Sequence, residues 1–315
     1  IPVGAWNATT GRQTAIEILG NIETSGGNIE FVTEAGDGAT THTDIAAVHA
    51  DRTIDAGSGN ITFRQSEPDY DYYGHDLTLR TTGTLTISPL ADYFYTDYTT
   101  GTPAPFAWNG SLAGGALNGS DSIAGLVIND LANLGGLTIG KSASSSNSAV
   151  TISSAVGIAG PIAVYGDTIT LDSALSTSNT TTGDIALTAT TGLAGAAGMT
   201  LAAGRSLAVT QSGQTAYSGV IAGTNATLTK SGAGTLALLA VNTYSGGTTV
   251  SGGTLGLYTN TAAGTGTIDL QANSTLSLGL AVTEVANNIT LVAGGSMFFL
   301  PKFDLDAILA CLPGA

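Results

Sequence analysis

The chain has 315 residues, of which 44 are glycine and only 10% are charged, against about 25% charged residues in an ordinary globular domain. Its formal net charge of −15 argues against binding to nucleic acid or anionic lipid, because both require basic patches. A hydrophobic share of 43% excludes a disordered chain, and the sequence has no apolar run of about 18 residues that predicts a membrane-spanning helix.

The chain begins at Ile1 rather than at methionine, which predicts a processed or excised part of a longer precursor. Residues 1–13 show no clear period, and a repeating pattern starts at residue 14. Residues 22–31 (IETSGGNIEF) are echoed by residues 54–63 (IDAGSGNITF) at an offset of 32. Internal similarity at such a period predicts stacked structural units, that is, a solenoid. Residues 1–13 are then expected to cover the free strand edge of its first turn.

Residues 65–110 interrupt the repeat with two acidic, proline-containing loops around two predicted strands at 77–80 and 84–88. Six of the ten tyrosines of the chain fall in this segment. Binding groups concentrate on loops that a rigid scaffold holds, so we predict a partner-binding surface there. The alternative is that these rings pack on each other and on the solenoid wall. The aromatic residues concerned are Tyr70, Tyr72, Tyr73, Tyr93, Phe94, Tyr95, Tyr98, Phe106 and Trp108.

The first of these loops also holds the best metal candidate, Glu67, Asp69, Asp71 and Asp76. Oxygen ligands at alternate positions suit Ca²⁺, although the spacing is not that of an EF-hand loop. A solvated acidic loop is the competing interpretation. No other cofactor is predicted.

Beyond residue 130, Thr alternates with Leu, Ile or Val, which predicts strands with an aliphatic inner face and a threonine outer face. Predicted strands include 137–140, 150–153, 162–165, 185–188, 206–210, 235–239, 275–280 and 289–292.

Ionisable side chains are scarce in the same region. Asp184 precedes Arg205 by 21 residues, so each can meet the other about one turn away, whereas Lys230 has no such partner. A lone ion pair is not a catalytic set, and we predict that the chain is not an enzyme.

The stretch from residue 217 to 258 combines short β-type runs with Ser-Gly and Gly-Gly turns. Its block at 228–236 (LTKSGAGTL) precedes one at 242–255 (NTYSGGTTVSGGTL). In this order the two blocks resemble the passenger-associated repeat of autotransporter adhesins. Residues 137–193 resemble, more diffusely, the repeats of filamentous-haemagglutinin-like adhesins. Both resemblances imply a right-handed parallel β-helix.

Residues 301–315 differ from the repeats. Asp304 is a candidate N-cap, and apolar residues at helical spacing up to Pro313 predict a short helix. It is expected either to cap the solenoid or to dock on another subunit or domain. The residues proposed for assembly are Phe303, Leu305, Ile308, Leu309, Cys311 and Leu312. Cys311 is the single cysteine, so it is either a buried small side chain or an intermolecular thiol.

Taken together, the sequence predicts an all-β chain: a right-handed parallel β-helix (β-solenoid) over residues 14–300, with extended surface loops and a short C-terminal helix. The resemblances imply a non-catalytic, extracellular or cell-surface bacterial adhesin or fibre protein. Its expected partners are other copies of itself or a surface or glycan receptor, and an outer-membrane translocator of the precursor. No nucleic acid and no membrane insertion are expected. The alternative is a β-helix polysaccharide lyase or hydrolase.

Overall fold

The computed structural model describes residues 13–33, 43–47, 50–65, 77–89, 95–97, 102–103, 106–108, 117–118, 126–128, 131–142 and 148–299. These residues are all-β apart from one short turn of 3₁₀ helix, η1 (Leu131–Asn133). Most strand pairs in them are parallel, which confirms the predicted parallel β-solenoid. The predicted C-terminal helix and residues 1–12 of the predicted N-terminal cap lie outside the described residues.

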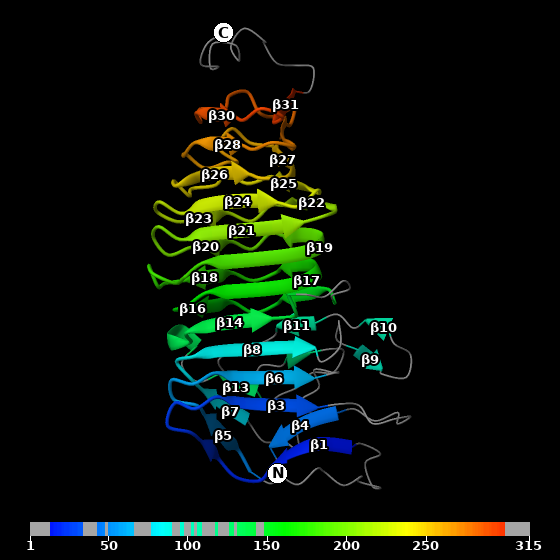
Figure 1. Cartoon of the computed structure of the whole chain (residues 1–315), viewed down its shortest axis with the longest axis vertical. Helices are drawn as coiled ribbons and strands as arrows, with labels where there is room; N and C mark the ends of the chain where they lie inside the picture. The colour runs from blue at the N-terminus through cyan, green and yellow to red at the C-terminus, as the bar shows by residue number, and fades with distance from the viewer. Residues whose placement is uncertain are drawn as a thin grey trace. The chain divides into compact units, whose positions relative to one another are not determined.

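The chain divides into two compact units, Ile1–Asp167 (unit 1) and Thr168–Ala315 (unit 2). We call one turn of the coil a rung. In unit 1, one parallel ladder joins the strands β3 (Ile29–Thr33), β6 (Ile61–Gln65), β8 (Thr84–Pro89) and β14 (Gly136–Ile139) (Figure 1). A second joins β2 (Ile22–Glu23), β5 (Arg52–Asp55), β7 (Leu77–Arg80) and β13 (Leu126–Ile128).

The 32-residue offset between the two similar sequence segments equals the number of residues between paired positions in the first two rungs. Ile22 pairs with Ile54, and Phe31 pairs with Phe63. Residues of the same type therefore lie one above the other in successive rungs. The ring centroids of Phe31 and Phe63 are 5.2 Å apart and the rings are nearly parallel. Stacked aromatic pairs of this kind add to the free energy of burial. The repeat in the sequence is therefore a repeat of core contacts.

The rest of unit 1 is built from short strands. β1 (Gln13–Ile18) and β4 (Thr43–Ala47) form a parallel pair, and β9 (Tyr95–Asp97) and β10 (Thr102–Pro103) form an antiparallel pair. β11 (Phe106–Trp108) pairs in parallel with β15 (Val150–Ile152) and antiparallel with β12 (Leu117–Asn118). β16 (Val156–Ile158) follows, and β17 (Ile162–Leu171) leads into unit 2.

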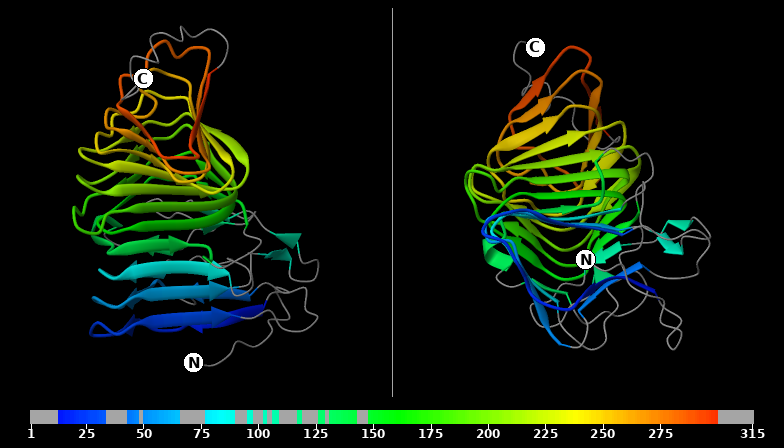
Figure 2. Two further views of the ribbon diagram at one scale, coloured as in Figure 1. Left: turned by 45° about the horizontal axis from the view of Figure 1, so that its top comes forward. Right: turned by 60° about the horizontal axis from the view of Figure 1, so that its bottom comes forward.

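Unit 2 is more regular, and its rungs carry three sets of strands. The first ladder is β19 (Ile185–Gly195), β21 (Ser206–Gln211), β24 (Thr227–Ser231), β26 (Gly247–Val250), β28 (Ile268–Leu270) and β30 (Ile289–Leu291). The second is β22 (Gln214–Tyr217), β25 (Thr235–Leu238), β27 (Gly253–Leu257), β29 (Ser274–Leu278) and β31 (Ser296–Phe299). The third contains β18 (Leu175–Thr177), β20 (Met199–Thr200) and β23 (Ile221–Ala222). In Figure 2 this region of the chain winds round and returns above itself in each rung.

The core of unit 2 follows from the alternation seen in the sequence. Leu207, Leu228 and Ile268 are buried in one column of the first ladder, whereas the outward Thr229 and Thr249 remain partly exposed. Removal of these aliphatic side chains from water is the main force that holds the rungs together.

Glycine marks the corners where one rung passes closest to the next. A Cβ atom on Gly234 would collide with the carbonyl oxygen of Gly213, and one on Gly253 with that of Gly234. Unit 1 has the same arrangement at Gly83 and Gly59. Adjacent strands lie only about 4.8 Å apart, so a corner backbone that sits directly over another leaves no room for a side chain.

No helix among the residues that the structure describes is long and apolar enough to cross a membrane.

Candidate functional site

Two adjacent rungs of unit 2 bear the sequence blocks singled out at 228–236 and 242–255. β24 and β25 form one rung, and β26 and β27 form the next, with Lys230 paired to Val250 and Leu236 to Leu255. Lys230 thus stands in a column of inward-facing residues between Val209 and Val250. The side chain is fully buried, which is rare for lysine.

The Lys230 ammonium group is bonded to the corner that follows its own strand and to the corner one rung further on. Nζ donates to the carbonyl oxygens of Ser231 and Gly232, both at 2.9 Å, and of Gly252 at 3.1 Å. Burial lowers the pKa of Lys230 to about 8 from 10.5, because the charged form loses its water. Lys230 therefore acts as a clamp between two rungs, and its three acceptors are main-chain carbonyls rather than carboxylates.

A second clamp lies at the next corner. The amide of Asn242 is buried, and its Oδ1 accepts from the backbone N–H of Ile221 at 2.7 Å. Its Nδ2 donates to the carbonyl of Ala262 at 2.6 Å. Asn242 therefore ties its own rung to the rung before it and to the rung after it.

Tyr244 and Thr248 complete that corner. The Tyr244 hydroxyl lies 2.6 Å from Oγ1 of Thr248, and this Oγ1 donates to the carbonyl of Ala263 at 3.3 Å. Burial raises the pKa of Tyr244 above its ordinary value of 10.0. The ring fills space beside Gly264, where a Cβ would meet both the ring and the carbonyl of Tyr244.

Gln211 is a similar clamp in the preceding rung. Its buried side chain donates from Nε2 to the carbonyl of Thr235 at 2.7 Å and to Oγ1 of Thr215 at 2.9 Å. Its Oε1 accepts from the backbone N–H of Leu193 at 3.3 Å. The buried Tyr217 hydroxyl donates to the carbonyl of Ala197, one rung back.

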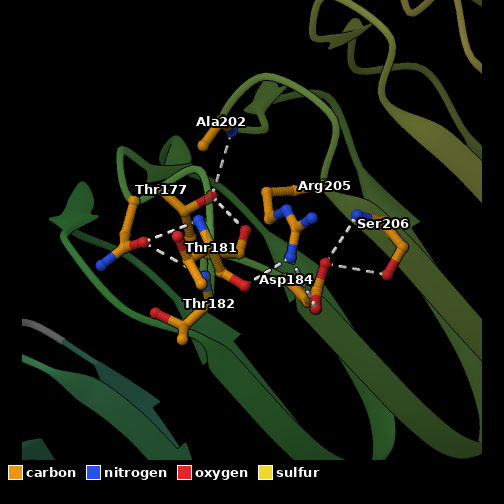
Figure 3. Close-up of polar contacts among 9 residues, drawn as sticks. Thr177, Thr181, Thr182, Asp184, Ala202, Arg205 and Ser206 are labelled. Carbon is orange, nitrogen blue, oxygen red and sulfur yellow. Dashed lines mark hydrogen bonds and ion pairs between the residues drawn. The ribbon is translucent and has the colours of Figure 1, made fainter.

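On the outside of unit 2, Asp184 and Arg205 form the ion pair that their spacing predicted (Figure 3). Oδ2 of Asp184 lies 3.9 Å from Nη1 of Arg205, and Oδ1 accepts from the backbone N–H of Ser206 at 2.7 Å and from its Oγ at 3.0 Å. Nη1 of Arg205 also donates to the carbonyl of Thr181 at 2.5 Å. The pair joins neighbouring rungs, like the buried clamps.

The turn before Asp184 is braced by two more side chains (Figure 3). Oγ1 of Thr177 donates to the carbonyl of Gly183 at 2.6 Å and accepts from the backbone N–H of Ala202 at 3.3 Å. Oδ1 of Asn179 accepts from the backbone N–H groups of Thr181 and Thr182 at 2.8 and 3.1 Å. The polar groups of this cluster are thus engaged in fixing a turn and its neighbour.

The structure places one predicted partner-binding side chain, and it corrects the prediction for that residue. Trp108 is fully buried on β11, not exposed on a loop, because Trp108 pairs with Ile152 in a parallel ladder. Tyr95 lies on β9 and Phe106 on β11. The other predicted contact residues lie outside the described residues: Tyr70, Tyr72, Tyr73, Tyr93, Phe94 and Tyr98. The contact surface stays a prediction for all of them except Trp108.

The Ca²⁺ candidates and the assembly residues also fall outside the described ranges. They are Glu67, Asp69, Asp71 and Asp76 for the metal, and Phe303, Leu305, Ile308, Leu309, Cys311 and Leu312 for assembly. In the portion of the chain that the structure describes, no group of three or more His, Cys, Asp or Glu side chains is placed to hold a metal ion.

The buried clamps were missed from the sequence, although a signal for one was present. Lys230 follows Leu228 by two residues in an alternating strand, so it takes an inward position. Asn242 and Tyr244 lie in the corner between β25 and β26, where apolar and polar residues do not alternate. Alternation therefore does not predict that they are buried.

Comparison with known families supports the resemblance that the sequence suggested. Residues 228–257 match the passenger-associated-transport-repeat family. No curated protein and no solved structure matches the chain. The likeness of residues 137–193 to filamentous-haemagglutinin-like adhesins stays a prediction. The chain therefore carries a passenger-associated-transport-repeat, folded as two clamped rungs of a parallel β-solenoid.

Proposed function

We propose that this chain is part of an autotransporter passenger, displayed outside a bacterial cell, where it serves as a non-catalytic adhesin or fibre segment. The observation that carries the proposal is the matched repeat at residues 228–257, which lies within a parallel solenoid of like rungs. A solenoid grows by repetition and presents long, continuous faces, which suits extension from a surface and contact with a partner.

The use of the ionisable groups supports a non-catalytic role. Lys230 is bonded to three corner carbonyls, and the Asp184–Arg205 pair holds backbone groups of neighbouring rungs. A general acid, base or nucleophile needs a group that can approach a substrate. These groups are instead engaged in holding the coil together. The expected partners are a surface or glycan receptor or other copies of the chain.

Display can be tested by replacing the passenger of an autotransporter with residues 1–315 in a Gram-negative host. Intact cells are treated with an impermeant biotinylation reagent and with protease, and the chain is followed by immunoblot. We expect the chain to be labelled and cleaved on intact cells, and the cells to adhere more than cells that carry the barrel alone. A chain that stays inaccessible while the barrel reaches the outer membrane would contradict the proposal.

The enzymatic alternative has its own measurement. The purified chain is incubated with polygalacturonate and alginate, with and without Ca²⁺, and cleavage is followed by absorbance of unsaturated ends and by reducing-sugar release. We expect no turnover under either condition. Ca²⁺-dependent cleavage would instead identify a β-helix polysaccharide lyase or hydrolase.

A further inference from the structure

The second sheet of unit 2 carries a tyrosine ring that lies on its outer surface. Tyr258 directly follows β27 and is 43% exposed. A Cβ on Gly256 would lie 3.2 Å from Cε2 of this ring, and a Cβ on Gly279 would lie 2.6 Å from its Cδ1 and 2.9 Å from its Cε1. The ring therefore rests against the sheet across two rungs, in a space that exists only because both positions are glycine.

Exposed apolar residues also occur at the ends of the strands in the two neighbouring rungs. Leu239 precedes it by one rung and is 40% exposed, and Leu280 follows Gly279 on the next rung and is 64% exposed. The backbone bonds from Tyr258 to Leu238, 3.0 Å, and from Gly279 to Leu257, 2.7 Å, keep the three rungs in register. Exposed apolar side chains on successive rungs favour an interaction site at this end of the strands.

Hydroxyl groups stand on the same face, four residues along the strand from the ring, which is about 13 Å. The register of the sheet stacks Thr235, Thr254, Thr275 and Ser296 in one column, about 4.8 Å apart. Thr254, Gly256 and Tyr258 alternate along one strand, so they share the outward side. The column therefore offers hydroxyl groups on the face that carries the ring, although those of Thr275 and Ser296 are bonded to each other at 2.8 Å.

Among the described residues 206–299, this face carries no ionic partner for a charged ligand. From residue 206 to 299 the sequence has three residues of the types Lys, Arg, Asp, Glu and His, namely Lys230, Asp269 and Glu284. Lys230 is buried, Asp269 belongs to β28 of the first ladder, and Glu284 lies beyond β29. A charged ligand would lose hydration here without gaining an ion pair, so a neutral ligand is favoured.

We propose that this outer face of β25, β27, β29 and β31, centred on Tyr258, binds neutral polysaccharide. The C–H face of one sugar ring stacks on the exposed side of Tyr258, and hydroxyl groups of sugar units further along the same polysaccharide bond to the Thr235–Ser296 column. The inference deepens the proposed function, because it names the class of receptor that an adhesin of this architecture contacts.

The test uses the full chain and three neutral probes, cellohexaose, laminarihexaose and chitohexaose, with hexagalacturonate as the anionic comparison. Binding is measured by titration calorimetry. We expect at least one neutral probe to bind and the anionic probe to bind more weakly. Tyr258→Ala should lower the affinity by about tenfold or more, since it removes the stacking surface, whereas Tyr258→Phe should retain binding.

Two further variants separate binding from folding. Ser277→Arg places a long charged side chain on the same face without removing the ring, and it should also abolish binding. Tyr165→Ala removes a partly exposed tyrosine of β17 and should leave binding unchanged. Circular dichroism of each variant must match that of the original chain.

Absence of binding to all three neutral probes overturns the inference, as does binding that Tyr258→Ala and Ser277→Arg leave intact. Analytical ultracentrifugation of the chain without ligand tests whether a second copy of the chain binds this face instead. A dimer that Tyr258→Ala dissociates would mean that a second copy covers this face, and the glycan assignment would be wrong. Display on cells is measured separately, so failure of display and failure of glycan binding are told apart.

Discussion

Units 1 and 2 are both parallel coils, but they differ in the regularity of their rungs. In unit 1 the step from a residue to its partner one rung on is 32 from Ile29 to Ile61, 24 from Ile61 to Leu85 and 52 from Leu85 to Leu137. In unit 2 the corresponding steps along the first ladder stay between 20 and 22.

The regular unit also has buried polar side chains that bond across its rungs. Lys230, Gln211, Asn242 and Thr248 are buried there and bonded across rungs, whereas in unit 1 Oδ1 of the exposed Asn28 accepts from the backbone N–H of Asn60. Equal rung lengths bring the same corner into register repeatedly, so one side chain can reach the backbone of the next rung. Regular spacing thus permits clamps inside the coil of unit 2.

The largest expected effect comes from the glycine corners. Gly234→Ala should destabilise unit 2 by about 3 kcal/mol, because the new methyl group collides with the carbonyl of Gly213. Gly252→Ala is the matched control, since a Cβ there meets its nearest atom at an ordinary 3.5 Å. Hydrogen exchange of the β24–β27 amides measures the local opening free energy. Equal effects of the two changes would refute the corner argument.

A smaller loss should follow removal of the buried clamp. Lys230→Met preserves the length of the side chain but leaves three corner carbonyls without their donor, which should cost roughly 2 kcal/mol in the same exchange measurement. A neutral effect of Lys230→Met would show that the charge burial cancels the bonds.

Alkaline pH should affect the stability of unit 2 in two opposite ways. The pKa of Lys230 is about 8 when folded and 10.5 when unfolded, so between these values the unfolded chain binds more protons and stability rises with pH. The raised pKa values of Tyr217 and Tyr244 act in the opposite sense, so stability falls again above pH 10. The rise should be of order 1 kcal/mol. Lys230→Met should abolish the rise while leaving the fall.

The smallest effects concern the outer ion pairs. Asp184→Ala should destabilise unit 2 by about 1 kcal/mol, because Asp184 also accepts from Ser206 on the next rung. Glu30→Ala removes an exposed pair with Arg64 in unit 1 and should cost less than about 0.5 kcal/mol. Added salt should reduce the second effect almost to zero. Similar losses of stability for Asp184→Ala and Glu30→Ala would mean that the bond from the Ser206 backbone N–H to Asp184 contributes little.

Much of the fold could be predicted because its signals are local. Alternation placed strands at 77–80 and 206–210, and the repeated Ile and Phe residues gave the register of Ile22 with Ile54. The spacing of Asp184 and Arg205 gave their contact, because unit 2 has rungs of nearly constant length.

The remainder depends on contacts that sequence spacing does not define. Trp108 pairs with Ile152, 44 residues away, in a region of unequal rungs, so it was assigned to a loop. Asn242 bonds to backbone groups of two other rungs. Every residue type has these groups, so the sequence does not identify the partners. The position of the Tyr258 ring depends on Gly256 of its own strand and on Gly279 one rung on, and sequence spacing does not define the second contact.

The rung-to-rung bonding of unit 2 has a mechanical consequence. Each strand pairs with the strand of the rung before and the rung after, so a pulling force on the two ends of the unit loads these interfaces in series. Such a stack yields by peeling at its weakest interface. Additional rungs would extend its reach without raising the force that it withstands, and the interfaces clamped by Lys230 and Asn242 are where peeling would pause.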